Sequence, residues 1–399
     1  MTNHHSFSRR QFIQSLASTM VVGSILPSVS LAKNSSNEKI LVVVELSGAN
    51  DGLNTFVPYA NDVYYKLRPR IGIPAHKVLK IDDQYGFNPG MVAFQNLYKD
   101  GQVAVIHGCG YAQPSLSHFT SMAYWHTGAP NTGERYGWLG RLADAIDPQM
   151  QANYLVNIDE RQSLAVMAKN HMPLVFDDPD KFTRKGLYQA RDILNMQNSM
   201  NETSEIKSYL NAADANAKNS SQLIKSAWDN YGTPIDYGLN PMGLNKVAAM
   251  IAAGINSRIF YTSYRHNAFD THVQQTNVHQ RLLMYVSDAI DAFMKDLKRL
   301  GRQDDVTVMI FSEFGRRPAE NTSLGTDHGT ANHMYVVGHN VKGGHYGKAP
   351  SLTDLDEGGN LKYTVDFRSV YASMAENWMG YKDSSDILYK NFDKFNFWS

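Results

Sequence analysis

The chain of 399 residues contains one cysteine, Cys109. An intramolecular disulfide is therefore excluded, and so is a metal site built mainly from thiolates. Neither charge is in excess, since 38 basic residues balance 38 acidic ones, and nothing in the composition indicates nucleic-acid binding. No segment has the ~20 consecutive apolar residues of a spanning helix, so we expect a mature form that does not cross a membrane.

The first 32 residues have the ordered features of an export signal. Arg9 and Arg10 form a twin-arginine pair, a mostly apolar segment covers 16–26, and residues 30–32 give a small-x-small cleavage pattern. We expect the twin-arginine export machinery to deliver the protein to the periplasm or the cell exterior, with cleavage near Lys33. The alternative is a disordered basic tail ahead of a buried helix. Loss of residues 1–32 removes two arginines and leaves a formal charge of about −2.

Residues 33–399 are expected to form one α/β domain. The apolar runs 40–44, 103–106, 258–262 and 306–311 are typical of strands buried on both faces. Apolar residues at helical spacing lie between these runs, and this alternation predicts a doubly wound, mostly parallel sheet flanked by helices. A further strand is expected over 334–338, and His328 lies before it. If this strand runs antiparallel to the others, its start lies at the same end of the sheet as the other candidate ligands.

A segment at about 150–240 differs from the rest. It mixes polar helical stretches with turn residues and has few signals of buried strands. We expect a helical or irregular insertion that caps the sheet.

Polar side chains follow the predicted strands, at the places where ligands of an open α/β sheet collect. The expected metal ligands are Asp51, Asp270, His272, Glu313, Asp327 and His328. Carboxylates combined with imidazoles suit zinc, manganese or magnesium, and a subset of carboxylates alone would suit calcium. The sequence thus predicts a divalent metal site. His118, His333 and His345 are weaker candidates.

Ser117 lies at a predicted helix start, where backbone N–H groups and the helix dipole favour an anionic group. A nearby divalent ion would activate its hydroxyl, as in ester hydrolysis through a serine intermediate. A simple N-cap is the alternative role. Arg316 is a candidate to hold an anionic substrate group, or else to form a buried ion pair with Glu313.

Several motifs together resemble a family of twin-arginine-exported bacterial proteins of unknown function, placed in the alkaline phosphatase-like and sulfatase superfamily. These motifs are residues 45–52 (ELSGANDG), 117–119 (SHF), 269–272 (FDTH), 312–316 (SEFGR) and 327–329 (DHG). The resemblance covers nearly all of the mature chain. It implies an alkaline phosphatase-like fold.

The resemblance also implies roles for individual residues. Asp51 would be a metal-bridging acid and Ser117 the nucleophile. Asp270 and His272, helped by His328, would hold one metal.

The chain also departs from the superfamily's pattern. Glu313 stands where the superfamily usually has the aspartate of an Asp-His pair, and the next residue is Phe314. The loss of that imidazole weakens a second metal site, so one metal or none is implied. No Cys-x-Pro-x-Arg or Ser-x-Pro-x-Arg segment occurs, which excludes the formylglycine chemistry of true sulfatases.

The sequence therefore predicts an exported, metal-dependent hydrolase of phosphate or sulfate esters, acting on a small anionic ester or a glycan. One alternative is a noncatalytic envelope or extracellular binding protein that keeps the fold, and Phe314 favours it. Another is a scaffold protein with a structural metal site.

Overall fold

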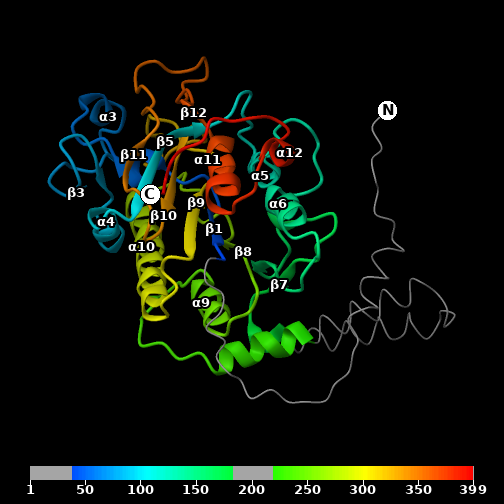
Figure 1. The fold of residues 1–399 in the computed structure, drawn as a ribbon. Coiled ribbons are helices and arrows are strands. Elements are labelled where there is room, and N and C mark those ends of the chain that lie inside the picture. Colours follow the sequence, from blue (N-terminus) through cyan, green and yellow to red (C-terminus); the bar gives the residue numbers. More distant parts are fainter. Residues whose placement is uncertain (1–37, 183–218, 399) are drawn as a thin grey trace, which may run out of the picture.

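The computed structural model describes residues 38–182 and 219–398. The predicted export signal, residues 1–32, lies outside them. Within these ranges the centre of the protein is a nine-stranded sheet with the order β11-β5-β10-β9-β1-β8-β6-β7, and β12 pairs with β5 (Figure 1). Its strands are β1 (Ile40–Leu46), β5 (Val103–Gly110), β6 (Leu155–Ile158), β7 (Leu174–Phe176), β8 (Ile259–Tyr264), β9 (Val306–Phe311), β10 (Asn332–Val337), β11 (Gly344–Tyr346) and β12 (Val365–Asp366).

The strand directions confirm the expected α/β class. β1 pairs in parallel with β8 and β9, and β6 pairs in parallel with β8 and β7. β10 runs antiparallel to both of its neighbours, β9 and β5, which is the direction that the grouping of His328 with the other candidate ligands required. The first residue of β10 therefore lies at the sheet edge where the parallel strands end.

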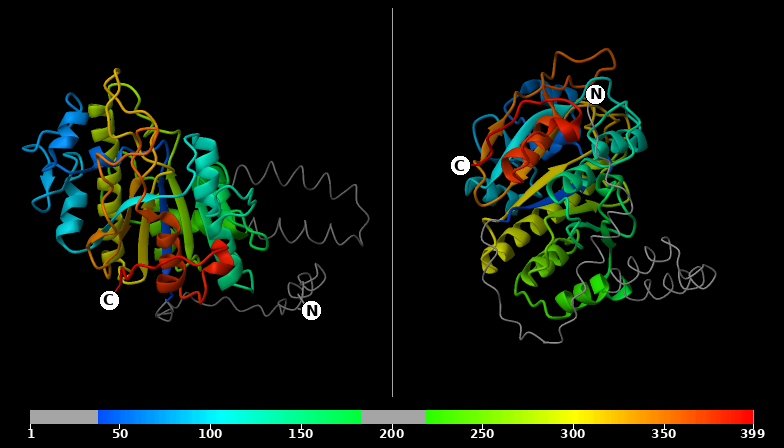
Figure 2. Two further views of the ribbon diagram at one scale, coloured as in Figure 1. Left: turned by 90° about the horizontal axis from the view of Figure 1, so that it is seen from above. Right: turned by 45° about the vertical axis from the view of Figure 1, so that its right-hand side comes forward.

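Helices cover both faces of the sheet. One layer contains α4 (Val92–Lys99), α9 (Leu244–Ala252) and α10 (Gln275–Arg299), and the other contains α5 (His118–Thr127), α6 (Trp138–Ile146) and α11 (Phe367–Ser373). In the right-hand view of Figure 2, α11 in red and α10 in yellow lie on opposite sides of the sheet. Among the described residues, no helix combines the length and the hydropathy needed to cross a membrane.

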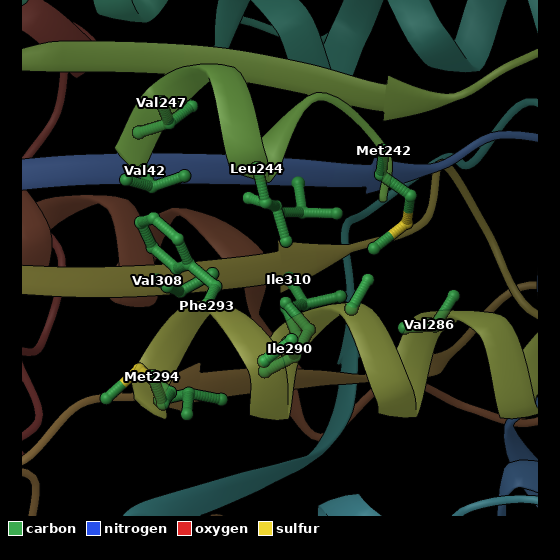
Figure 3. Close-up of a cluster of buried hydrophobic side chains, with 14 of the residues drawn as sticks. Val42, Met242, Leu244, Val247, Val286, Ile290, Phe293, Met294, Val308 and Ile310 are labelled. Atoms are coloured by element: carbon green, nitrogen blue, oxygen red, sulfur yellow. The ribbon is translucent and has the colours of Figure 1, made fainter. Parts of the chain in front are cut away.

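The strands are apolar on both faces because each face meets a helical layer. In β1, Val42 and Val44 belong to the core under α9 and α10, whereas Leu41 and Val43 belong to the opposite core. Figure 3 shows the first of these cores, where Val42 packs with side chains of α9 and α10 such as Leu244. Full burial of one such side chain contributes about 1.5–3 kcal/mol.

The fold also contains shorter elements. They are α2 (Gly52–Thr55), α3 (Asp62–Leu67), α12 (Ser385–Leu388), the 3-10 helix η1 (Leu164–Val166), the π-helix η2 (Met374–Trp378), and a three-stranded sheet of β2 (Phe56–Val57), β4 (Gly86–Phe87) and β3 (Leu79–Lys80).

The expected insertion at about 150–240 differs from the structure in its first part. β6 and β7 both lie within it, and both belong to the central sheet rather than to a cap. Each is only three or four residues long, and β6 contains the polar Asn157, so neither strand has the apolar run that identifies a buried strand. Residues 183–218 of the expected insertion lie outside the described residues.

A buried ion-paired histidine joins α6 to the segment before β7. His171 Nδ1 lies 2.8 Å from Asp144 Oδ1, and its Nε2 lies 3.0 Å from Asp147 Oδ2. Burial lowers the pKa of His171, but the hydrogen bonds and charges of Asp144 and Asp147 outweigh it and raise that pKa overall. The same contacts lower the pKa of both carboxyls against the effect of burial.

These shifts predict a pH-dependent contribution to stability. Because the folded state raises the pKa of His171, its protonation stabilises the fold. This stabilisation is fully present below the unfolded-state pKa and is lost as the pH rises through the folded-state pKa. Because the folded state lowers the pKa of Asp144 and Asp147, their ionisation also stabilises the fold. This stabilisation is present above the unfolded-state pKa values and is lost as the pH falls through the folded-state values. The difference in unfolding free energy between wild type and His171→Asn should therefore be largest between about pH 4 and pH 6.5. A difference that stays constant from pH 3 to pH 9 would contradict the ion pairing.

Candidate metal centre

Four predicted or candidate side chains meet beyond the carboxyl ends of β8 and β9. Asp270 Oδ1 lies 3.0 Å from His272 Nε2 and 3.2 Å from His328 Nε2, and Asp270 Oδ2 lies 3.5 Å from His118 Nε2. His328 Nε2 lies 3.1 Å from His118 Nε2 and 2.9 Å from His272 Nε2. We call Asp270, His118, His272 and His328 the histidine–aspartate cluster. His118, Asp270 and His328 are its most compact part, with ligand atoms all within 4.8 Å of one another.

Three different parts of the chain build this cluster. Asp270 and His272 follow β8, and His328 precedes the antiparallel β10, so both loops reach the same edge of the sheet. His118 is the first residue of α5. The sequence predicted that Asp270, His272 and His328 would lie together, and the structure brings them together.

Each histidine uses its Nδ1 atom for an outer contact. His118 Nδ1 lies 2.7 Å from Glu313 Oε1, and His328 Nδ1 lies 2.8 Å from the carbonyl oxygen of Leu116. His272 Nδ1 lies 3.4 Å from Asp327 Oδ1. In the neutral tautomer that carries its proton on Nδ1, each ring uses these acceptors and leaves its Nε2 atom free to bind a metal. Metal-ligating histidines are usually held in this way.

Glu313 is therefore not in direct contact with the ligand atoms but one layer behind them. Its buried carboxylate accepts hydrogen bonds from His118 Nδ1 and, at 2.9 Å, from the backbone N–H of Gly48. The hydrogen bond from His118 to Glu313 raises the pKa of His118, although burial acts in the opposite direction. The structure therefore places Glu313, which was predicted as a metal ligand, behind His118 and outside the compact group of His118, Asp270 and His328.

Arg316 also differs from its expected role. Its buried guanidinium donates to Asp270 Oδ1 and to the carbonyl oxygens of Gly48, Ala49 and Thr326 at 2.7, 2.7 and 2.9 Å. Burial raises the pKa of Asp270, but the hydrogen bond and charge of Arg316 outweigh it and lower that pKa overall. Arg316 thus fixes Asp270 as a carboxylate and does not form the alternative ion pair with Glu313.

Asp51 is separated from the cluster by a partner that the sequence did not suggest. Arg68 Nη1 lies 2.6 Å from Asp51 Oδ2 and Arg68 Nη2 lies 3.0 Å from Asp51 Oδ1, and both residues are fully buried. Gln275 donates a further hydrogen bond to Oδ2. Because both carboxylate oxygens are occupied, the expected metal-bridging role of Asp51 does not fit this geometry. No local sequence motif marks Arg68 as a buried residue.

Ser117 and Asp327 lie at the rim. Ser117 is exposed and is the N-cap residue of α5, but among the described residues its hydroxyl makes no capping hydrogen bond. Leu116 and His118, on either side of it, both contact the cluster. Asp327 is half exposed, accepts a hydrogen bond from Asn321 at 3.1 Å, and supports His272 from outside.

Phe314 fills the position where the resemblance leads one to expect a histidine. Its ring is buried and stacks on His118, with a centroid distance of 5.0 Å and an interplanar angle of 30°. It also lies 5.0 Å from the ring of His328. The apolar ring of Phe314 thus packs beside two histidines of the cluster, His118 and His328.

Comparisons with known proteins place the chain in context. A family described as "Protein of unknown function (DUF1501)" matches residues 38–390. A search of curated proteins gave no match. Solved structures that match include a protein in the alkaline phosphatase superfamily from Vibrio parahaemolyticus, with 11% identity, a TM-score of 0.38, and coverage of 86% of this chain and 71% of the other.

Two further solved structures that match are those of proteins named as enzymes. The PsFucS1 sulfatase from Pseudoalteromonas sp. has 11% identity and a TM-score of 0.40, and the match covers 87% of this chain and 69% of the sulfatase. The phosphonate monoester hydrolase SpPMH from Silicibacter pomeroyi has 9% identity and a TM-score of 0.40, with coverage of 90% and 78%. Similarities this low do not bear on the chemistry of the site.

Proposed function

The chain belongs to the DUF1501 family of proteins of unknown function, which confirms the family resemblance of its motifs; from its site we propose that it is an exported, metal-dependent hydrolase of phosphate or sulfate esters. One observation carries this proposal. Three imidazole Nε2 atoms and the Asp270 carboxylate face one another, while each Nδ1 atom has its own acceptor. Export rests on the features of residues 1–32.

The donor set fits a divalent cation. Unprotonated Nε2 atoms at 2.9 and 3.1 Å from one another bring their lone pairs into repulsion, and a proton on one ring relieves just one such contact. A metal ion bound by His118, His328 and Asp270 relieves the contact between these two rings and leaves a coordination position open. A donor set of imidazole nitrogens with one carboxylate oxygen favours zinc or manganese over magnesium and calcium, which prefer oxygen ligands.

The surroundings favour one ion rather than two. The predicted ligand Asp51 is bound by Arg68, and Phe314 occupies the place of another ligand. When bound at the cluster, the metal would polarise an ester oxygen as a Lewis acid. Arg316 keeps Asp270 ionised and oriented, and Glu313 holds the His118 ring in place.

Ser117 is our candidate for the nucleophile. It stands between two residues that contact the cluster, at the N-terminus of the ten-residue helix α5, whose free N–H groups favour an anionic ester. Its hydroxyl is exposed and uses no capping contact, so it is accessible to a substrate.

Substitution of Ser117 tests this role. We expect Ser117→Ala to lower the hydrolysis of p-nitrophenyl phosphate or p-nitrophenyl sulfate by at least about 100-fold, because the nucleophile is lost. The metal content should stay at the wild-type level. Thr120→Ala, in the same helix, serves as the control and should retain activity. Full turnover by Ser117→Ala would remove the serine from the mechanism.

A structural metal site is the second candidate function, and one observation favours it. If all four side chains of the histidine–aspartate cluster bind zinc, the tetrahedral site is closed and leaves no position for a substrate. Chelation would then lower the melting temperature of a protein without ester hydrolysis. An open site needs His118, Asp270 and His328 as its ligands, so His272→Ala should retain the metal if the centre is catalytic.

A further inference from the structure

A second group of histidines lies on the sheet face that carries α4 and α10. His107 of β5, His333 of β10 and His345 of β11 come from strands that are neighbours in the sheet (Figure 1). The His107 ring centroid lies 5.1 Å from those of both His333 and His345. We call these residues the three-histidine row. Val105 and Tyr335, two residues away along β5 and β10, belong to the apolar core of this face.

A chain of contacts fixes the protonation of the row. The Nε2 atom of His345 lies 3.0 Å from Asp82 Oδ2, and its Nδ1 atom lies 3.0 Å from His107 Nε2. The carboxylate of Asp82 accepts a hydrogen bond from the N–H group at His345 Nε2, so in the neutral ring His345 Nδ1 is an acceptor and His107 Nε2 donates to it. His107 Nδ1 is then an unprotonated acceptor.

The row ends in unpaired atoms. Among the described residues, the Nδ1 atoms of His107 and His333 have no hydrogen-bond partner, and both side chains are more than nine-tenths buried. Burial lowers the pKa of His107 to about 4 and lowers the pKa of His333 well below its usual value, so both rings are neutral at neutral pH. Buried acceptors without partners are unfavourable, and native proteins rarely retain them without a ligand or water.

Both unpaired histidines line a cavity of about 40 Å³. Its walls include Phe56 and Tyr85, which are stacked with centroids 5.2 Å apart, together with apolar residues such as Leu53. Gly52 leaves room beside the row, since a Cβ atom there would lie 2.9 Å from His333 Nδ1.

The residues that line the cavity favour an uncharged ligand over a cation or an anion. Its described lining contains no carboxylate to balance a cation. Arg316 is its one charged lining residue, and this guanidinium already donates to Asp270 and to backbone carbonyls, so an anion gains little there.

We propose that this cavity is a second ligand site, which binds a hydroxyl group of a small uncharged molecule. The hydroxyl donates its hydrogen bond to His107 Nδ1, and the apolar part of the ligand packs against Phe56 and Tyr85. The site shares Arg316 with the region of the metal centre, but none of its proposed contacts involves the histidine–aspartate cluster. The proposal of a second ligand site therefore does not depend on whether the protein is a hydrolase.

Two small probes with the same carbon skeleton test the site in the full mature protein. 2-Propanol carries an O–H donor, whereas acetone is an acceptor alone. We expect 2-propanol to shift the ¹⁵N resonances of the His107 ring in a saturable manner, and acetone to leave them unchanged. Equal effects of both probes, or no saturable shift with either, would overturn the proposal, and this comparison needs no variant.

Asp82→Asn provides a sharper test, because it should reverse the polarity of the row. Asp82 Oδ1 accepts the N–H groups of Gln84 and Tyr85, each at 2.7 Å, and this contact directs the amide nitrogen of an asparagine toward His345. That nitrogen donates to His345 Nε2, which moves the proton to Nδ1, and His107 Nδ1 becomes a donor.

Acetone should therefore bind Asp82→Asn with a saturable shift. The matched control is Asp83→Asn, at the adjacent exposed residue, which should keep the wild-type preference for 2-propanol. Failure of acetone to bind Asp82→Asn, with the variant folded as judged by its amide spectrum, would contradict the proposed proton arrangement.

Discussion

Replacement of Asp51 by alanine is expected to lower the free energy of unfolding by about 3–5 kcal/mol, because it leaves the buried Arg68 guanidinium without its carboxylate. Urea denaturation of the mature protein measures this loss of stability. The folded fraction of the variant should still bind metal at the wild-type level, because Asp51 contacts Arg68 and Gln275 rather than the histidine–aspartate cluster.

The double variant Asp51→Ala/Arg68→Met is the control for this prediction. Removal of both charges should restore much of the lost stability, since replacement of a buried ion pair by apolar groups is often nearly neutral. A variant that loses its metal but little stability would contradict the structural role and return Asp51 to the set of ligands.

Glu313→Gln is expected to weaken metal binding by about 10–100-fold, because outer partners of ligating histidines have effects of this size. The amide is nearly isosteric, but it removes the negative charge that accepts from His118 Nδ1 at 2.7 Å. Competition with a chelator of known affinity measures the change.

Asp327→Asn is the matched comparison for Glu313→Gln. Its carboxylate is half exposed and lies 3.4 Å from His272 Nδ1, so its effect should be smaller. An unchanged affinity in Glu313→Gln, or a larger loss in Asp327→Asn, would contradict the role of Glu313 in orienting His118 for the metal.

The sequence predicted the parts of the site that depend on strand ends. Asp270 and His272 follow a β-branched and aromatic strand, and His328 precedes another, so the rule that ligands collect at the carboxyl ends of parallel strands was enough to group them. The grouping of His328 also required β10 to run antiparallel, which the sequence did not establish and the structure shows.

The remaining parts depend on contacts that no local pattern shows. His118 was a weaker candidate because its contact with Glu313 spans 195 residues. Asp51 and Glu313 were correctly picked as polar residues at strand ends, but a residue type does not reveal its partner, and the partners Arg68 and His118 set their roles. Strands β6 and β7 were missed because three or four residues carry too little periodicity.

The metal content of the mature protein, exported through its own signal and measured by elemental mass spectrometry, tests the central claim most directly. The variants to compare are His328→Ala, which removes a ligand that contacts Asp270 and both other histidines, and His76→Ala, which removes an exposed histidine outside the cluster. We expect about one zinc or manganese ion per chain in wild type and His76→Ala, and none in His328→Ala. Wild-type protein without bound metal, even after reconstitution, would contradict the metal centre and the hydrolase that depends on it.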